Sequence, residues 1–132
     1  MPIVLPPPLA STLWIALGGA LGSVGRYWLS ILFDRLLASS FPWATVVTNI
    51  TGSFVIGVVA ALPVGPSTRQ FLMVGVLGGY TTFSAFSLQT LVLVQDGELP
   101  KAAANVLVSV ILCLAAVWLG HTLAAGLRGG EA

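Results

Sequence analysis

Four long apolar stretches dominate this chain and constrain its fold more than any other feature. They run approximately over residues 9–33, 43–62, 71–94 and 102–123, and short connections that contain proline or glycine and at least one charge separate them. A helix needs about 20 apolar residues to cross the hydrocarbon core of a membrane. The stretches therefore predict an all-α integral membrane protein with four transmembrane helices.

The composition supports a single four-helix transmembrane domain over residues 1–132. Hydrophobic residues make up 57% of the chain and charged residues only 7%, whereas soluble domains carry about 25% charged residues. The apolar runs are continuous and do not alternate, which argues against a β-barrel. The net charge of +1 gives no reason to expect a nucleic-acid partner, so membrane lipid is the expected environment.

The basic residues are divided evenly between the two ends of the predicted helices. With four spans, the N-terminus, the second connection and the C-terminus share one side of the membrane, which holds Arg69 and Arg128, while the other side holds Arg35 and Lys101. The positive-inside rule therefore gives almost no preferred orientation. One interpretation is a fixed but weakly encoded topology. The other is a chain that inserts both ways and forms an antiparallel, dual-topology homodimer.

The acidic residues all lie outside the apolar stretches, and this disfavours several classes of function. They are Asp34, Asp96, Glu98 and Glu131. Proton-coupled cation exporters normally need a carboxylate inside the membrane, so a small dual-topology multidrug transporter is the weaker alternative. The sequence contains no carboxylate pair for acid–base catalysis, no nucleophile motif and no metal-ligand spacing, and we expect the chain not to be an enzyme.

Neutral polar and aromatic side chains inside the stretches gather on helix faces, by the i, i+3, i+4 spacing. They are Thr45, Thr48, Asn49 and Gly52 in the second stretch, Phe83, Phe86, Ser87 and Thr90 in the third, and Asn105 and Ser109 in the fourth. Such faces often serve only helix packing, so a non-transporting membrane scaffold is a second alternative. A pathway that is lined by donors and lacks carboxylates favours an anion over a cation.

The motif Gly78-Gly79-Tyr80-Thr81-Thr82 lies close to the centre of the third stretch. Glycine weakens a helix and β-branched threonine does little to restore it, so we expect the third helix to be broken near the bilayer midplane. The first half of a broken helix ends in free carbonyl groups, which suit a small cation. If two inverted copies met at their breaks, these carbonyls could form an oxygen-lined cage for a structural sodium ion.

Three motifs together resemble the Fluc (CrcB) family of fluoride channels. They are Gly19-Ala-Leu-Gly-Ser-Val-Gly-Arg-Tyr27, Thr48-Asn-Ile-Thr-Gly-Ser53 and Gly75-Val-Leu-Gly-Gly-Tyr-Thr-Thr-Phe-Ser-Ala-Phe-Ser87. The resemblance covers all four stretches in order. It implies an antiparallel dual-topology homodimer with two fluoride pores in the cytoplasmic (inner) membrane of a prokaryote. It also implies passive, electrodiffusive export of fluoride.

The resemblance further implies roles for individual residues. Asn49 would donate a hydrogen bond to the ion, Phe83 and Phe86 would line the pores with their ring edges, and Ser109 would be a pore hydroxyl. Arg26 matches an arginine of the first span near the aqueous entrance. These residues are the core of the predicted fluoride pore.

The central sodium ion is expected, from the same resemblance, on the main-chain carbonyls of Gly78 and Thr81. The sequence departs from the family pattern at Ala85, where many relatives have a hydroxyl residue. Any hydroxyl role at that position would be absent or moved to Ser84 or Ser87. The predicted pore therefore also includes Ser84 and Thr82.

Overall fold

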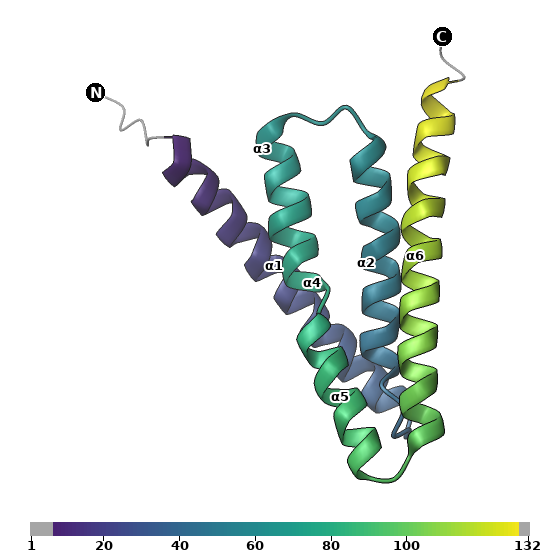
Figure 1. Cartoon of the computed structure of the whole chain (residues 1–132). Coiled ribbons are helices and arrows are strands. Elements are labelled where there is room, and N and C mark those ends of the chain that lie inside the picture. The colour runs from purple at the N-terminus through teal and green to yellow at the C-terminus, as the bar shows by residue number, and fades with distance from the viewer. Residues whose placement is uncertain (1–6, 130–132) are drawn as a thin grey trace.

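The computed structural model describes residues 7–129, and within them the chain folds into four long apolar helical spans (Figure 1). This confirms the prediction of an all-α fold with four long apolar helices, which is consistent with a multi-pass membrane protein. The elements are α1 (Pro7–Leu36), α2 (Trp43–Ala61), a third span made of α3 (Pro66–Arg69), the π-helix η1 (Gln70–Leu77), α4 (Gly78–Tyr80) and α5 (Phe83–Gln95), and finally α6 (Leu99–Gly129).

The first and last helices continue beyond the apolar stretches that predict them. Helix α1 begins at Pro7, two residues before residue 9, because proline is tolerated in the first turn of a helix, where its missing N–H would have no partner. Helix α6 runs from Leu99 to Gly129. Its second residue is Pro100, which is tolerated in the first turn for the same reason. Hydropathy marks only the part of a helix that suits hydrocarbon, so the helix ends extend past it.

Helices α2 and α6 lie side by side along most of their length (Figure 1). Glycine permits this close approach from both sides. A Cβ atom on Gly57 would clash with the carbonyl oxygen of Val117, and a Cβ atom on Gly120 would clash with that of Phe54. The two backbones therefore touch directly, as is common where small residues line a membrane helix interface.

Helix α1 crosses the third span along a second glycine face. A Cβ atom on Gly18 would lie 2.6 Å from the carbonyl oxygen of Phe71, and one on Gly22 would clash with that of Val76. From the other side, a Cβ atom on Gly79 would clash with the carbonyl oxygen of Gly19. Any side chain at these positions would push α1 away from η1 and α4.

The third span contains two extended residues between α4 and α5. Thr81 has φ −78° and ψ 158°, and Thr82 has φ −154° and ψ 119°. Gly78, by contrast, is helical, with φ −64° and ψ −35°. The extended backbone thus lies at the threonines and not at the glycines, since Gly79 serves close packing against α1. We call these two residues the extended dipeptide Thr81–Thr82.

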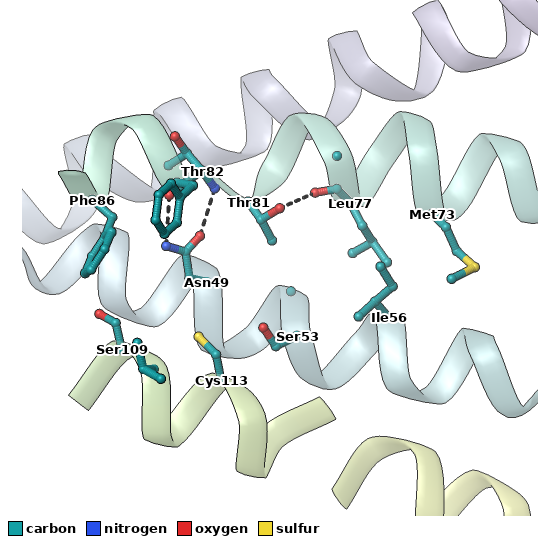
Figure 2. Close-up of a pocket in the computed structure, with 14 residues that line it drawn as sticks. Asn49, Ser53, Ile56, Met73, Leu77, Thr81, Thr82, Phe86, Ser109 and Cys113 are labelled. Carbon is teal, nitrogen blue, oxygen red and sulfur yellow. Dashed lines mark hydrogen bonds between the residues drawn. The ribbon is translucent and has the colours of Figure 1, made fainter. Parts of the chain in front are cut away.

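The start of α1, the α2–α3 connection and the end of α6 lie toward one end of the molecule, and the other connections lie toward the opposite end (Figure 1). The α5–α6 connection turns at Gly97, whose φ of +77° lies in the left-handed region that favours glycine. The extended dipeptide Thr81–Thr82 lies between these ends and faces α2 (Figure 2).

Candidate functional site

A cavity of about 350 Å³ lies where α2, the third span and α6 meet (Figure 2). Its lining comes from all three. The lining residues are Asn49, Gly52, Ser53, Ile56, Met73, Leu77, Gly78, Thr81, Thr82, Phe83, Phe86, Ser109, Val110 and Cys113. Polar side chains and aromatic rings therefore share one space in an otherwise apolar molecule.

Seven of the nine residues predicted for the ion and metal sites line this cavity. They are Asn49, Gly78, Thr81, Thr82, Phe83, Phe86 and Ser109. Ser84 is exposed, and its hydroxyl lies 3.3 Å from the hydroxyl of Thr82 outside the lining. Arg26 also lies outside the lining and contacts the third span from α1. The sequence thus groups residues from three separate segments that the fold places together.

Asn49 binds the backbone of Thr82 through both ends of its amide (Figure 2). The Thr82 N–H donates to Asn49 Oδ1 at 2.8 Å, and Asn49 Nδ2 donates to the Thr82 carbonyl at 3.0 Å. A buried backbone group without a partner is costly, and Thr82 cannot use its helical partners because its backbone is extended. The Asn49 side chain, which comes from α2, supplies the hydrogen-bond partners instead. One hydrogen of the Asn49 NH₂ group remains for another acceptor.

Helix α1 supplies donors for the carbonyl end of α4. Arg26 Nε donates to the Gly79 carbonyl at 3.2 Å, and the Ser23 hydroxyl donates to the same oxygen at 3.4 Å. In a continuous helix this oxygen would accept from the N–H of Phe83. The guanidinium group is a favourable partner because the carbonyl end of a helix carries partial negative charge. Arg26 therefore stabilises the end of α4 from outside the cavity.

The start of α5 is capped by its own N-cap residue. The Thr82 hydroxyl accepts a hydrogen bond from the N–H of Ala85 at 3.2 Å. Threonine is among the residues that favour this position. Thr81 bonds to the preceding turn of the chain. Its hydroxyl and its N–H each donate to the Leu77 carbonyl at 2.9 Å. Both threonines are thus held by local bonds.

Two carbonyl groups that border the cavity lose their usual helical donors. The Gly78 oxygen would accept from the N–H of Thr82 in a continuous helix, but that N–H donates to Asn49. The Thr81 oxygen would accept from the N–H of Ala85, which instead donates to the Thr82 hydroxyl. A Cβ atom on Gly78 would meet only the Met73 carbonyl, at 3.7 Å. These oxygens are therefore left without their usual helical donors.

The two phenylalanines form the aromatic part of the lining. The ring centroids of Phe83 and Phe86 are 5.3 Å apart and the planes are tilted by 44°. The Phe83 residue is 78% exposed. Ring edges carry partial positive charge, so they can interact with an anion. The exposure of Phe83 means that the cavity is open on one side of a single chain.

A chain of buried and part-buried hydrogen bonds leads from the cavity along α6 and α5. The Ser109 hydroxyl lies 3.5 Å from Asn105 Oδ1, and Asn105 Nδ2 donates to the Thr90 hydroxyl at 2.8 Å. The Thr90 hydroxyl in turn donates to the Phe86 carbonyl at 2.8 Å. Asn105 is fully buried. The sequence places Asn105 and Ser109 on one face, but the bond to Thr90 across helices is visible only in the fold.

The cavity lining contains no charged side chain among residues 7–129, and no group of His, Cys, Asp or Glu in that part of the chain could hold a metal ion. Ser53, Met73 and Cys113 line the cavity without having been predicted as site residues. Ser53 ends the Thr48–Ser53 motif, so the sequence signal for it was present. Met73 and Cys113 have no signal that separates them from other apolar residues.

The chain resembles known proteins over nearly its whole length. Residues 13–121 match the model of a family described as "CrcB-like protein, Camphor Resistance (CrcB)". The "Fluoride-specific ion channel FluC" of Opitutus terrae is 56% identical over 123 residues, which cover 88% of this chain and 93% of the relative. The protein of the same name from Rhodospirillum rubrum is 58% identical over 117 residues, which cover 83% and 90% of the two chains.

Proposed function

The chain belongs to the CrcB family, and from this premise we propose that it is a fluoride-selective ion channel. The family is one of ion channels and not of enzymes. Relatives that are 56% and 58% identical are named fluoride-specific ion channels. In this chain the channel would lower cytoplasmic fluoride by passive export, and we place it in the cytoplasmic (inner) membrane of a prokaryote.

The cavity between α2, the third span and α6 is the observation that carries the proposal. Fluoride is small and strongly hydrated, so a pathway must replace its water with groups of positive character. The free amide hydrogen of Asn49, the hydroxyl of Ser109 and the ring edges of Phe83 and Phe86 are such groups, and all of them border one cavity. Carboxylates, which would repel the ion, are absent from the lining formed by residues 7–129.

Export through such a pathway needs no coupled ion. An interior-negative membrane potential drives an anion outward, by about 2.3 kcal/mol per charge for each 100 mV. The described carboxylates, Asp34, Asp96 and Glu98, lie outside the central part of the spans, where a proton-coupled exporter would need one. Passive conduction therefore fits the charge distribution better than exchange.

The functional unit in this proposal is an antiparallel, dual-topology homodimer with two pores. The cavity is open on the side of Phe83 and of the exposed residue Gly78, so a second copy could complete its wall. The equal numbers of basic residues at the two ends permit both orientations in the membrane. An inverted copy would bring the extended dipeptide Thr81–Thr82 of each chain toward a common axis near the bilayer midplane.

A structural sodium ion at that axis fits the residues present. Gly78 and Thr81 line the cavity, and the usual helical donors of their carbonyl groups are engaged elsewhere. Hard cations prefer oxygen ligands, and carbonyls of an interrupted membrane helix can supply them. Two chains would offer four such oxygens. The ion would hold the two copies together and would take no part in moving fluoride.

Fluoride release from liposomes that contain the purified protein is the test. A potassium ionophore carries the balancing charge, an ion-selective electrode records fluoride, and chloride is the comparison anion. We expect rapid fluoride release and negligible chloride release. Liposomes that hold well-folded protein and release no fluoride would contradict the proposal.

Two variants separate a channel from a scaffold. Asn49→Ala removes the amide that binds Thr82, and Phe83→Ile removes a ring edge from the lining. A channel should lose fluoride flux in both variants, while Phe83→Ile, which breaks no hydrogen bond, should still purify as the same oligomer. Unchanged flux in both would exclude the assigned pathway.

A further inference from the structure

Two arginines from distant segments meet the carbonyl end of α2. Arg128, near the end of α6, donates from a terminal guanidinium nitrogen to the Ala61 carbonyl at 2.7 Å. Arg69, at the end of α3, approaches the next carbonyl, that of Leu62, at 3.5 Å. Because these are consecutive residues, both guanidinium groups are held at the same turn of the chain. We call Arg69 and Arg128 the arginine pair.

The arginine pair has no carboxylate partner among residues 7–129. The ion pair found in that part of the chain, Lys101 with Glu98 at 2.9 Å, lies at the opposite end, where Asp34 and Asp96 also lie. Glu131 lies outside the described residues. The two ends carry equal numbers of basic residues. The described acidic residues lie at the end opposite Arg128, so they do not neutralise the arginine pair. Two cations that contact consecutive carbonyl groups favour a bound anion.

The donors of the arginine pair exceed what the carbonyls use. A guanidinium group has five N–H donors in a planar fork, and each arginine gives one to a carbonyl oxygen. Both residues are exposed, so the remaining donors are accessible. A phosphate group is an anion that this fork fits, since its oxygens, like those of a carboxylate, accept two parallel hydrogen bonds.

Apolar surface beside the arginine pair indicates that the phosphate is carried by a lipid. Leu127, next to Arg128, is 79% exposed, and Leu123, one turn earlier, is 52% exposed. Acyl chains could cover these side chains while the headgroup meets the guanidinium groups, which is where arginine lies when it reaches from a span to the interface. We infer that the arginine pair binds the phosphate of an anionic phospholipid headgroup.

Lipid binding to the purified full-length protein tests this inference independently of fluoride flux. The protein in detergent is titrated with dioleoylphosphatidylglycerol or with the zwitterionic dioleoylphosphatidylcholine, and native mass spectrometry counts the bound lipids. We expect preference for phosphatidylglycerol. Arg69→Gln or Arg128→Gln should weaken phosphatidylglycerol binding about fivefold each, the equivalent of about 1 kcal/mol per basic residue.

Arg35→Gln is the matched control, because it removes the same charge from an exposed arginine at the other end. It should leave the lipid preference unchanged. If Arg128→Gln does not fold, Arg69→Gln alone decides, since it removes only the long 3.5 Å contact. Equal phosphatidylglycerol binding by Arg69→Gln and the wild-type protein would overturn the inference. Displacement of the lipid by millimolar inorganic phosphate would overturn the assignment to a lipid headgroup and favour free phosphate.

Discussion

Asn49 shows at the residue scale how one side chain can replace part of a helix. Its amide supplies an acceptor at 2.8 Å and a donor at 3.0 Å to the backbone of Thr82, which belongs to a different span. The geometry uses one of the two amide hydrogens and leaves the other. Asn49 therefore has two separable tasks, since it holds the extended dipeptide Thr81–Thr82 and, in the proposed channel, presents a donor to fluoride.

Asn49→Asp should reduce fluoride release at least about tenfold, because a Thr82 carbonyl left without a donor costs about 1–3 kcal/mol and a carboxylate would repel the anion. The variant keeps an oxygen that can accept from the Thr82 N–H. Release is measured from liposomes, with size-exclusion chromatography to check assembly. Wild-type rates in this variant would mean that neither task of Asn49 limits conduction.

Thr82 is the N-cap of α5, and this role can be tested at the same scale. Thr82→Ala removes the hydroxyl that accepts from Ala85 N–H and should lower the free energy of unfolding by about 0.5–2 kcal/mol. Thr82→Ser retains a hydroxyl and is the matched control. Thermal unfolding in detergent measures both. Equal unfolding midpoints for the two variants would show that the cap contributes little.

Glycine faces determine how the elements pack. The α1 face that carries Gly18 and Gly22 meets the backbone of η1 directly, and Gly57 and Gly120 do the same between α2 and α6. In a membrane, lipid offers no hydrophobic gain for helix association, so close packing supplies the attraction. The positions of these glycines thus fix which helices are neighbours.

Gly22→Ala should destabilise the fold by about 1–3 kcal/mol, because its Cβ would clash with the Val76 carbonyl, which is backbone and cannot rotate away. Gly126→Ala is the control, since a Cβ there meets nothing within 4 Å and alanine favours a helix. Thermal unfolding of the two variants is compared with wild type. The expectation fails if the Gly22→Ala midpoint is not the lower of the two.

The elements could be predicted from the sequence where the signal is local, and not where it depends on distant pairing. Apolar length alone predicts the four spans, the Thr48–Ser53 motif contains Asn49, and the four-residue spacing from Asn105 places Ser109 on a polar face. The contact of Asn49 with Thr82 joins residues 33 apart, and that of Arg26 with Gly79 joins residues 53 apart. Spacing along one helix carries no information about such pairs. The glycines near residue 78 predict a weak helix in this region. The residues that are extended in the structure are Thr81 and Thr82, because Asn49 binds the backbone of Thr82 from another helix.

At the scale of the whole molecule, the single chain leaves its cavity open. Gly78 and Phe83 are exposed, although both line the cavity that also holds Asn49 and Ser109. An isolated chain would expose this region to lipid, where groups without hydrogen-bond partners are costly. The proposed inverted second copy would cover it, and the lack of orientation bias from the basic residues makes such a pair available.

Gly78→Val distinguishes contacts within a chain from contacts between chains. A Cβ on Gly78 meets only the Met73 carbonyl at 3.7 Å, so a larger side chain there meets few atoms of its own chain. We expect a helical protein by circular dichroism with a strongly reduced dimer fraction by single-molecule photobleaching in lipid. Gly65→Val, at a position with nothing within 4 Å and far from the cavity, is the control. An unchanged dimer fraction in Gly78→Val would remove Gly78 from the interface.

The double hydrogen bond between Asn49 and Thr82 also bears on gating. If α5 slid along α2 by even one residue, both bonds would break together and two backbone groups would lose their partners. In the proposed channel, the two bonds would therefore hold α5 in one register against α2 and so keep the pathway in one shape.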